Sequence, residues 1–152
     1  MADDSSPRLL LIVIGSTLRA EELDRPLGYY LQQQVERISK RLDLPFKPLV
    51  VADIGWMNDD SLQGVPTISI GGPGVNHLAR SWFEEVPFSL AVDERYCIQM
   101  DPDLAELRAS IWGMDNASTQ IAVSVFVDRF LPRFLEQAIH APDPIDLDDT
   151  DD

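Results

Sequence analysis

The sequence has a single cysteine, Cys97, so the chain cannot form an internal disulfide, and this scarcity is typical of a reducing compartment. It has only two histidines, His77 and His140, which lie far apart along the chain. Together these residues are too few for a zinc site, so we expect no metal and no cofactor. We expect Cys97 to be a small buried residue, although a nucleophilic pair with either histidine is formally available.

Long hydrophobic segments are also missing. The longest apolar run covers residues 9–14, and it follows Asp3 and Asp4 rather than the basic residues of a secretory signal. Because the run is too short to cross a bilayer, we expect no contact with membranes. The sequence therefore predicts a soluble, cytoplasmic protein.

Positive charge is scarce as well. The chain has 12 Lys and Arg residues against 26 Asp and Glu residues, which gives a formal net charge of −14. Eight of the acids lie near the two ends, but residues 5–142 still carry 12 basic against 18 acidic side chains. Such a surface repels phosphate backbones and anionic lipids, so we expect no nucleic acid and no membrane as a general partner. A local basic pocket remains compatible with this balance.

The length of 152 residues and a hydrophobic content of 45% fit one globular domain of ordinary size. We assign residues 1–7 to a flexible leader and residues 8–140 to a single α/β domain. Residues 141–152 are rich in proline and aspartate, so we expect a disordered acidic tail there.

The firmest local prediction is a strand, a glycine-rich turn and a helix in direct succession over residues 67–86. Residues 67–70 favour a strand, three of the next four positions are glycine, and Pro73 suits the first turn of a helix. Apolar residues then recur at helical spacing, which predicts one face packed on a sheet: Val75, Leu78, Ala79, Trp82, Phe83 and Val86.

Several further strands are expected. Residues 8–14 and 48–54 are apolar runs without alternation, which is typical of strands buried on both faces of a parallel sheet. Residues 108–112 form another candidate strand. Residues 88–92 and 96–100 form either a hairpin or a single regular strand.

Two longer helices complete the expected fold. Residues 24–42 form the first, with Asp24 as its cap and Pro26 at an early position. Residues 118–139 form the closing helix, which Pro132 must kink. We predict a three-layer α/β domain with a mainly parallel sheet of about five strands, wrapped in a Rossmann-like or flavodoxin-like manner.

Three loops at strand ends, residues 15–17, 71–76 and 113–118, each precede a helix. In a parallel sheet they meet at the carboxyl edge, where helix N-termini favour an anion such as a phosphate or carboxylate. The alternative interpretation is that the glycines only turn the chain, and that Ser16 and Asn116 are only caps. The candidate ligand-binding residues are Gly15, Ser16, Thr17, Gly71, Gly72, Gly74, Asn76, His77, Arg80, Asn116 and Ser118.

The glycine loop matches neither the phosphate-loop motif nor the G-x-G-x-x-G dinucleotide motif, because it lacks the lysine of the first and the spacing of the second. Over a short stretch, GGPGVNHLARSWFE resembles the glycine loop of the lysine-decarboxylase-like nucleotide-binding proteins, which also lies between a strand and a helix. Val75 and Asn76 stand where that family has threonine and then functional acids. The resemblance therefore implies a strand-to-helix loop and no activity.

Other polar residues are weaker candidates. His77 and Arg80 are three positions apart on a predicted helix, so they either face an anion together or form a solvated pair. Arg19 and Arg95 would strengthen such a pocket if they converge on it. Carboxylates that could bind magnesium or act as acids and bases show no pairing in their spacing, so we expect them to be solvated: Asp53, Asp59, Asp60, Asp93 and Asp115.

The closing helix is apolar on more than one stripe. Val123, Val127 and Leu131 form a row that either contacts a protein partner or second subunit, or is covered within the chain. No complete catalytic signature is present, so the sequence favours a non-catalytic interaction or assembly subunit that associates through residues 118–139, from Ser118 to Ile139. The alternative is a nucleotide- or phosphate-binding α/β domain, which would be an enzyme or a binding protein, with residues 71–76 (Gly71 to Asn76) as the anion cradle.

Overall fold

The computed structural model describes residues 7–85, 89–92 and 95–142. The expected leader and acidic tail lie almost wholly outside the described residues. Within the described ranges, none of the helices has the length and apolar character needed to cross a membrane.

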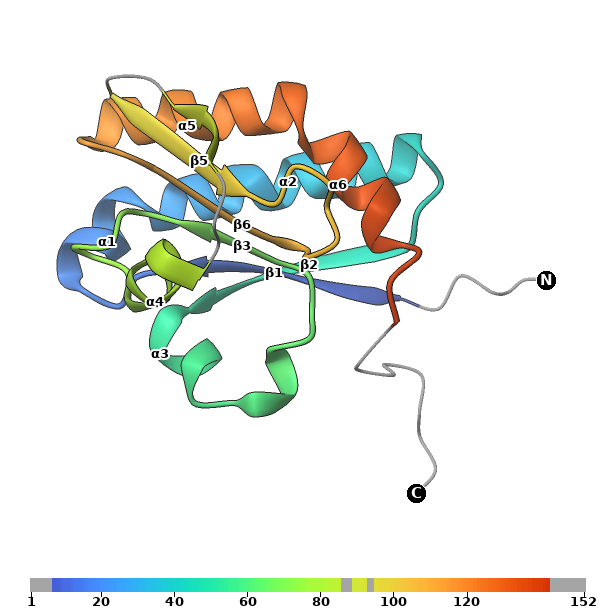
Figure 1. Ribbon diagram of the computed structural model, residues 1–152, viewed down its shortest axis with the longest axis horizontal. Helices are drawn as coiled ribbons and strands as arrows, with labels where there is room; N and C mark the ends of the chain where they lie inside the picture. Colours follow the sequence, from blue (N-terminus) through green and yellow to red (C-terminus); the bar gives the residue numbers. More distant parts are fainter. Residues whose placement is uncertain (1–6, 86–88, 93–94, 143–152) are drawn as a thin grey trace.

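The domain is organised around a six-stranded sheet with the order β2-β1-β3-β6-β5-β4 (Figure 1). Four strands run parallel, and they are β2 (Phe46–Ala52), β1 (Arg8–Ile14), β3 (Thr67–Ile70) and β6 (Arg108–Gly113). An antiparallel pair, β5 (Tyr96–Met100) and β4 (Ser89–Val92), extends the sheet beyond β6. The predicted three-layer, mainly parallel α/β class is confirmed, and the hairpin alternative raises the strand number from about five to six.

Helices cover both faces of the sheet (Figure 1). One face packs against α2 (Arg25–Arg41), α5 (Asn116–Arg129) and α6 (Leu131–Ala138), and the other against α3 (Asp53–Met57) and α4 (His77–Glu85). The short helix α1 (Leu18–Leu23) joins β1 to α2, and a 3-10 turn, η1 (Asp60–Leu62), follows α3.

The continuous apolar run of β1 is explained by burial on both faces. Leu10, Ile12 and Ile14 belong to the larger core under α2, α5 and α6. The alternate residues of the strand belong to a smaller core, where Trp56 and Trp82 meet edge to face at 5.7 Å between ring centroids. Two layers of side chains thus hold β1 in place.

Some element boundaries differ from the sequence-based expectation. Strand β2 covers residues 46–52 rather than 48–54, because Asp53 already begins α3. Pro73 does not lie in the first turn of a helix. Helix α4 begins at His77 because the side chain of Asn76 accepts a hydrogen bond from the backbone N–H of Ala79 at 3.0 Å, which caps the helix there.

Pro132 interrupts the closing helix, as expected. Helix α5 ends at Arg129 and α6 begins at Leu131, because the backbone of Phe130 leaves the helical region at φ −124°.

The apolar row of the closing helix lies inside the single chain. Val123, Val127 and Leu131 are buried in the larger core, the same core that contains Leu31 and Val35 of α2. Of the two interpretations given above, the row is thus covered within the chain. The side chains that suggested a partner contact through residues 118–139 are therefore not available on the surface of the chain.

Val127→Asp should unfold the protein or destabilise it by on the order of 4 kcal/mol, because Val127 is 5% exposed and an unpaired carboxylate there would lose its hydration. Ile121→Asp is the matched control, since Ile121 lies on the same helix and is 47% exposed. Urea unfolding followed by circular dichroism measures both variants. A Val127→Asp chain that is folded and as stable as the control would place the row in water or at an interface.

Candidate functional site

A cavity of about 210 Å³ opens at the carboxyl edge of the parallel strands. Its walls come from α1 and the start of α2, from the glycine loop after β3, and from the junction of β6 with α5. The lining residues are Arg19, Ala20, Leu23, Asp24, Gly71, Gly72, Gly74, Val75, Gly113, Met114, Asp115, Asn116 and Thr119.

The topology explains why this space is open. Strand β3 lies between β1 and β6, and the helices that follow β1 and β6 pack on one face of the sheet. Helix α4, which follows β3, packs on the opposite face. The end of β3 is therefore left without a helix above it, at the point where consecutive connections diverge, and ligands commonly bind at such points in open α/β sheets.

Gly71 shapes one wall of the cavity. Its backbone has φ +109°, a conformation that favours glycine, and a Cβ atom at this position would lie 2.8 Å from Oδ2 of Asp24. The glycine therefore makes room for a carboxylate that belongs to the chain itself.

Asp24 does not have the role that its sequence position suggests. It precedes α2, but its side chain makes no capping hydrogen bond. Only 7% of the residue is exposed, and no group in the described part of the chain donates a hydrogen bond to its carboxylate within hydrogen-bonding distance. Burial raises the pKa of Asp24 from 3.8 to about 6, and the positive charge of Arg19 offsets only part of this rise.

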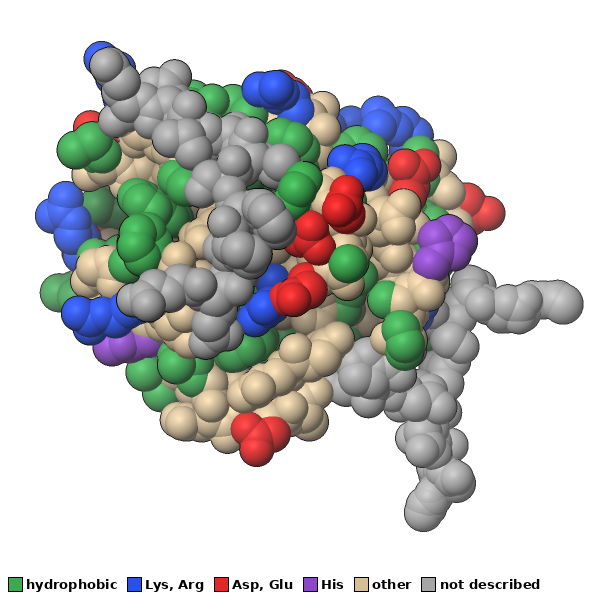
Figure 2. Space-filling view, viewed as in Figure 1, with side chains coloured by type: hydrophobic (Ala, Val, Ile, Leu, Met, Phe, Trp, Pro, Cys, Tyr) green, Lys and Arg blue, Asp and Glu red, His purple; other side chains and the backbone are tan. Residues whose placement is uncertain are grey.

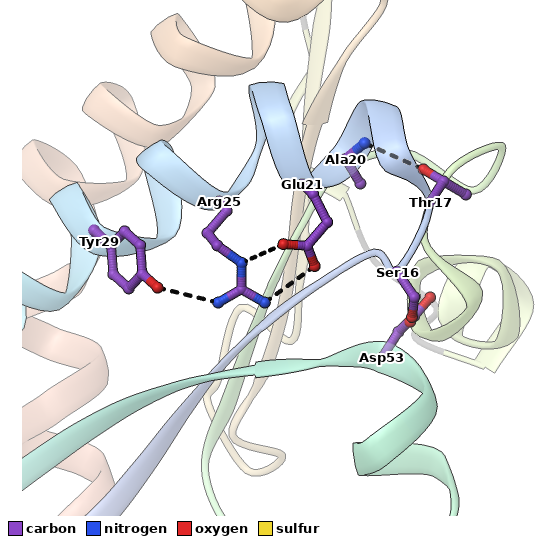
Figure 3. A network of polar contacts seen from close by, with 7 residues as sticks. All are labelled: Ser16, Thr17, Ala20, Glu21, Arg25, Tyr29 and Asp53. Atoms are coloured by element: carbon purple, nitrogen blue, oxygen red, sulfur yellow. Dashed lines mark hydrogen bonds and ion pairs between the residues drawn. The ribbon is translucent and has the colours of Figure 1, made fainter.

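A second buried acid, Asp53, lies on the other side of the glycine loop. The carboxylate is fully buried, its Oδ2 accepts the backbone N–H of His77 at 2.7 Å, and its Oδ1 accepts that of Ile54 at 2.7 Å. The hydroxyl of Ser16 also donates to Oδ1, and Figure 3 shows the two side chains pointing toward each other. The expectation that Asp53 is solvated is wrong, because the N-terminus of α4 binds this acid from a distant part of the sequence.

The anion cradle predicted at the start of α4 thus already contains an anion. Asp53 takes the first amide of the helix, and Asn76 takes that of Ala79. The other end of the Asn76 amide donates to the hydroxyl of Ser69 and to the carbonyl of Ile70 at 3.0 and 2.9 Å. The polar groups around Asn76 therefore form hydrogen bonds within the chain and hold the end of the glycine loop in place.

The remaining predicted residues divide between the cavity and its supports. Gly71, Gly72, Gly74 and Asn116 line the cavity. Most of the other positions support the loops behind its walls, whereas the side chains of His77 and Arg80 are exposed. Gly15 packs so close to the glycine loop that a Cβ atom there would lie 2.0 Å from the carbonyl oxygen of Val75.

Two more of the predicted positions, Thr17 and Ser118, take part in helix capping. Thr17 caps α1 by accepting the N–H of Ala20 at 3.1 Å. For α5 the cap is Asp115, rather than Asn116 or Ser118, and it accepts the N–H of Ser118 at 2.7 Å. The hydroxyl of Ser118 and then its backbone N–H lower the pKa of Asp115, with a smaller contribution from the charge of Arg95.

The four candidate cations do not converge. Arg19 lines the cavity, whereas His77 and Arg80 are exposed and lie outside its lining, as does Arg95. His77 contributes its backbone amide, not its ring, to the Asp53 cluster. Among the other expected acids, Asp59, Asp60 and Asp115 are exposed, while Asp93 lies outside the described residues. Cys97 on β5 is only partly buried.

Helices α1 and α2 are joined beside the cavity by an exposed polar network (Figure 3). Arg25 donates from Nε and Nη2 to the two oxygens of Glu21 at 2.7 and 3.1 Å, and from Nη1 to the hydroxyl of Tyr29 at 3.2 Å. Exposed pairs of this kind contribute only a few tenths of a kcal/mol. The network does pair the charges of Glu21 and Arg25 with each other, which leaves Arg19 as the basic residue of the cavity wall.

No protein-family model matches the chain, and no curated protein sequence is similar to it. The likeness of the glycine loop to lysine-decarboxylase-like proteins therefore stays confined to that short stretch. No group of three or more His, Cys, Asp or Glu side chains that could hold a metal ion occurs in residues 7–85, 89–92 and 95–142.

Asp53→Ala should destabilise the fold by about 2–4 kcal/mol, because it leaves two backbone amides without their acceptor at the start of α4 and α3. Asp103→Ala, at an exposed turn, is the control and should stay within about 0.5 kcal/mol of the wild type. Chemical unfolding measures both. An equally small effect of the two substitutions would contradict the role given to Asp53.

Asp24→Asn should stabilise the protein in a pH-dependent way. The pKa of the folded state lies above the unfolded value, so ionisation opposes folding and the stability of the wild type should fall as pH rises from about 4 to about 6. Asparagine does not ionise, so the variant should gain up to about 3 kcal/mol over the wild type above pH 7 and nothing at pH 4. Asp128→Asn, the same change at an exposed acid on α5, is the matched control. A pH-independent difference for Asp24→Asn, measured by unfolding at both ends of this range, would show that the carboxylate is already hydrated.

Proposed function

We propose that this protein is a ligand-binding α/β domain that holds a small polar molecule in the carboxyl-edge cavity. The observation that carries the proposal is a buried carboxylate, that of Asp24, in the wall of a cavity at the divergence point of the parallel sheet. Buried charges are normally paired, so an unpaired one beside an open space is best explained by a partner that comes from outside the chain.

Binding is favoured over catalysis by the composition of the walls. The lining residues that the structure describes include no serine, cysteine or histidine, so no hydroxyl–imidazole or thiol–imidazole pair lies in the cavity wall. Ser16, a serine of the strand-end loops, donates to the fully buried Asp53, and no imidazole takes part in the hydrogen bonds of this pair. The polar groups at this edge are thus suited to orient a ligand.

An interaction subunit is the second candidate function, and a specific observation favours it. Leu18 and Met114 are 78% and 80% exposed, and both lie at the carboxyl edge beside the cavity. Figure 2 shows hydrophobic and basic side chains gathered at the left end of the molecule, which is the end where β1 leads into α1. Exposed apolar side chains of this size are typical of a contact surface, for a ligand or for a protein partner.

A library of small metabolites titrated into ¹⁵N-labelled protein tests the proposal. Compounds that bind should shift the amide resonances of Asp24, Gly71, Gly72 and Asn116 together, because these residues surround one space. Gly74→Leu should weaken such binding about tenfold or more, since the position lines the cavity and has open space for a side chain.

The matched control is Gly55→Leu, because Gly55 also has open space around it but lies on α3, outside the cavity lining. It should bind the same compounds with unchanged affinity. If no compound moves the cavity resonances, or if Gly74→Leu binds as well as the control, the ligand-binding proposal fails and the interaction subunit becomes the better explanation.

A further inference from the structure

The burial of Asp24 and its lack of a hydrogen-bond donor restrict the chemistry of the ligand. Asp24 as a residue is more than nine-tenths buried, its Oδ2 lies against Gly71, and its carboxylate receives no hydrogen bond from the described part of the chain. A carboxylate only accepts hydrogen bonds, so the group that fits against it must donate them. A positively charged donor gains most, because it also compensates a charge that burial keeps from full hydration.

The other charged side chains around Asp24 also bear on the charge of the ligand. Among the described residues of the cavity lining, Arg19 on α1 is the only basic one, and Asp115 at the start of α5 is a second acidic one. The glycine loop contributes no charged side chain, and Glu21 and Arg25 are paired with each other. Asp115 already accepts a hydrogen bond from Ser118 and is influenced by the charge of Arg95, so the acceptor left without a donor in this wall is Asp24. An acceptor without a donor favours a cationic group over a phosphate.

We propose that the ligand is a small organic amine, and that its protonated amino group binds the Asp24 carboxylate. This inference rests on the ligand-binding function proposed above. An ammonium group brings its own N–H donors and is satisfied by a single carboxylate. A metal ion would need several ligating side chains, and no cluster of three occurs among the described residues.

The size of the cavity and the position of Arg19 narrow the class further. A space of about 210 Å³ lies below the range that holds drug-sized ligands, so it suits a molecule with a short carbon chain. Arg19 lines the same cavity, and its positive charge acts on Asp24. The guanidinium is thus placed to bind a carboxylate at the far end of an amine ligand, and an amino acid is the form of amine that would use both groups.

Binding of an amine should depend on pH through Asp24. With a pKa of about 6, the carboxylate is almost fully ionised at pH 7.5 and only about one-tenth ionised at pH 5. Aliphatic amines remain protonated at both values. The affinity for an amine should therefore fall about tenfold from pH 7.5 to pH 5.

Three probes with the same four-carbon chain test the inference: putrescine, γ-aminobutyrate and butyrate. Each is titrated into ¹⁵N-labelled full-length protein at pH 7.5 and pH 5, and the amides of Gly71, Gly72 and Asn116 are followed. The two amines should shift these resonances, more weakly at pH 5, and butyrate should not. Tighter binding of γ-aminobutyrate than of putrescine would show that Arg19 binds a carboxylate at the far end of the ligand. Tighter binding of putrescine would show that the preferred ligand is a diamine.

Asp24→Asn should weaken the binding of both amines at least tenfold at pH 7.5, and Asp128→Asn, the same change at an exposed position, should leave it unchanged. Arg19→Gln provides a second variant, which should weaken γ-aminobutyrate and leave putrescine unaffected. Equal amine affinity in Asp24→Asn and the wild type, or butyrate binding as tight as that of the amines, would overturn the inference. If the cavity binds library compounds that lack an amine and ignores these amines, the inference is wrong and the ligand-binding function stands. A cavity that binds nothing defeats both.

Discussion

The carboxylate of Asp53 ties together the segments on which the carboxyl edge depends. It accepts hydrogen bonds from the end of β1 through Ser16, from the start of α3 through Ile54, and from the first turn of α4 through His77. An acid at the N-terminus of a helix is also favoured by the helix dipole. Because α4 is held in this way, the glycine loop before it is fixed on both sides, and Gly71 is brought against Asp24. The shape of the cavity is thus a consequence of an interaction outside it.

Two aspartates at this edge have opposite environments. Asp53 is fully buried and its oxygens are supplied with donors by two backbone amides and a hydroxyl. Asp24 is nearly as buried, and the described residues supply it with none, so burial raises its pKa to about 6. The first arrangement stabilises the fold, whereas the second leaves a cost of burial that a ligand can relieve. This contrast is the physical reason for assigning structure to one acid and recognition to the other.

The fold could be predicted because its main signals are local. The unbroken apolar run of β1 indicates burial on both faces, and parallel strands bring their end loops to one edge whatever their order. The roles of Asp24 and Asp53 could not be predicted in this way. Asp24 stands two positions before Pro26, which is a local capping pattern, but its side chain turns to Gly71, and only tertiary packing decides this. The partner of Asp53 is the amide of His77, which lies 24 residues away, so no local pattern marks it. The apolar row of α5 failed as an interface signal for the same reason, since the sequence does not show that α2 packs in the same core.

The hydrogen bonds that cap the helix N-termini explain how the cavity differs from a phosphate site. In α/β proteins that bind phosphate, the free amides at helix N-termini are the main donors. In this chain three of the helix ends at the carboxyl edge are capped by its own side chains: α1 by Thr17, α4 by Asn76 and Asp53, and α5 by Asp115. The start of α2 has no such cap. These caps occupy part of the donor set that an anion would need, and a buried acceptor, Asp24, lies in the wall of the open space. The polarity of the site is therefore the inverse of a phosphate cradle, although the glycine-rich loop between strand and helix is of the kind that such cradles use.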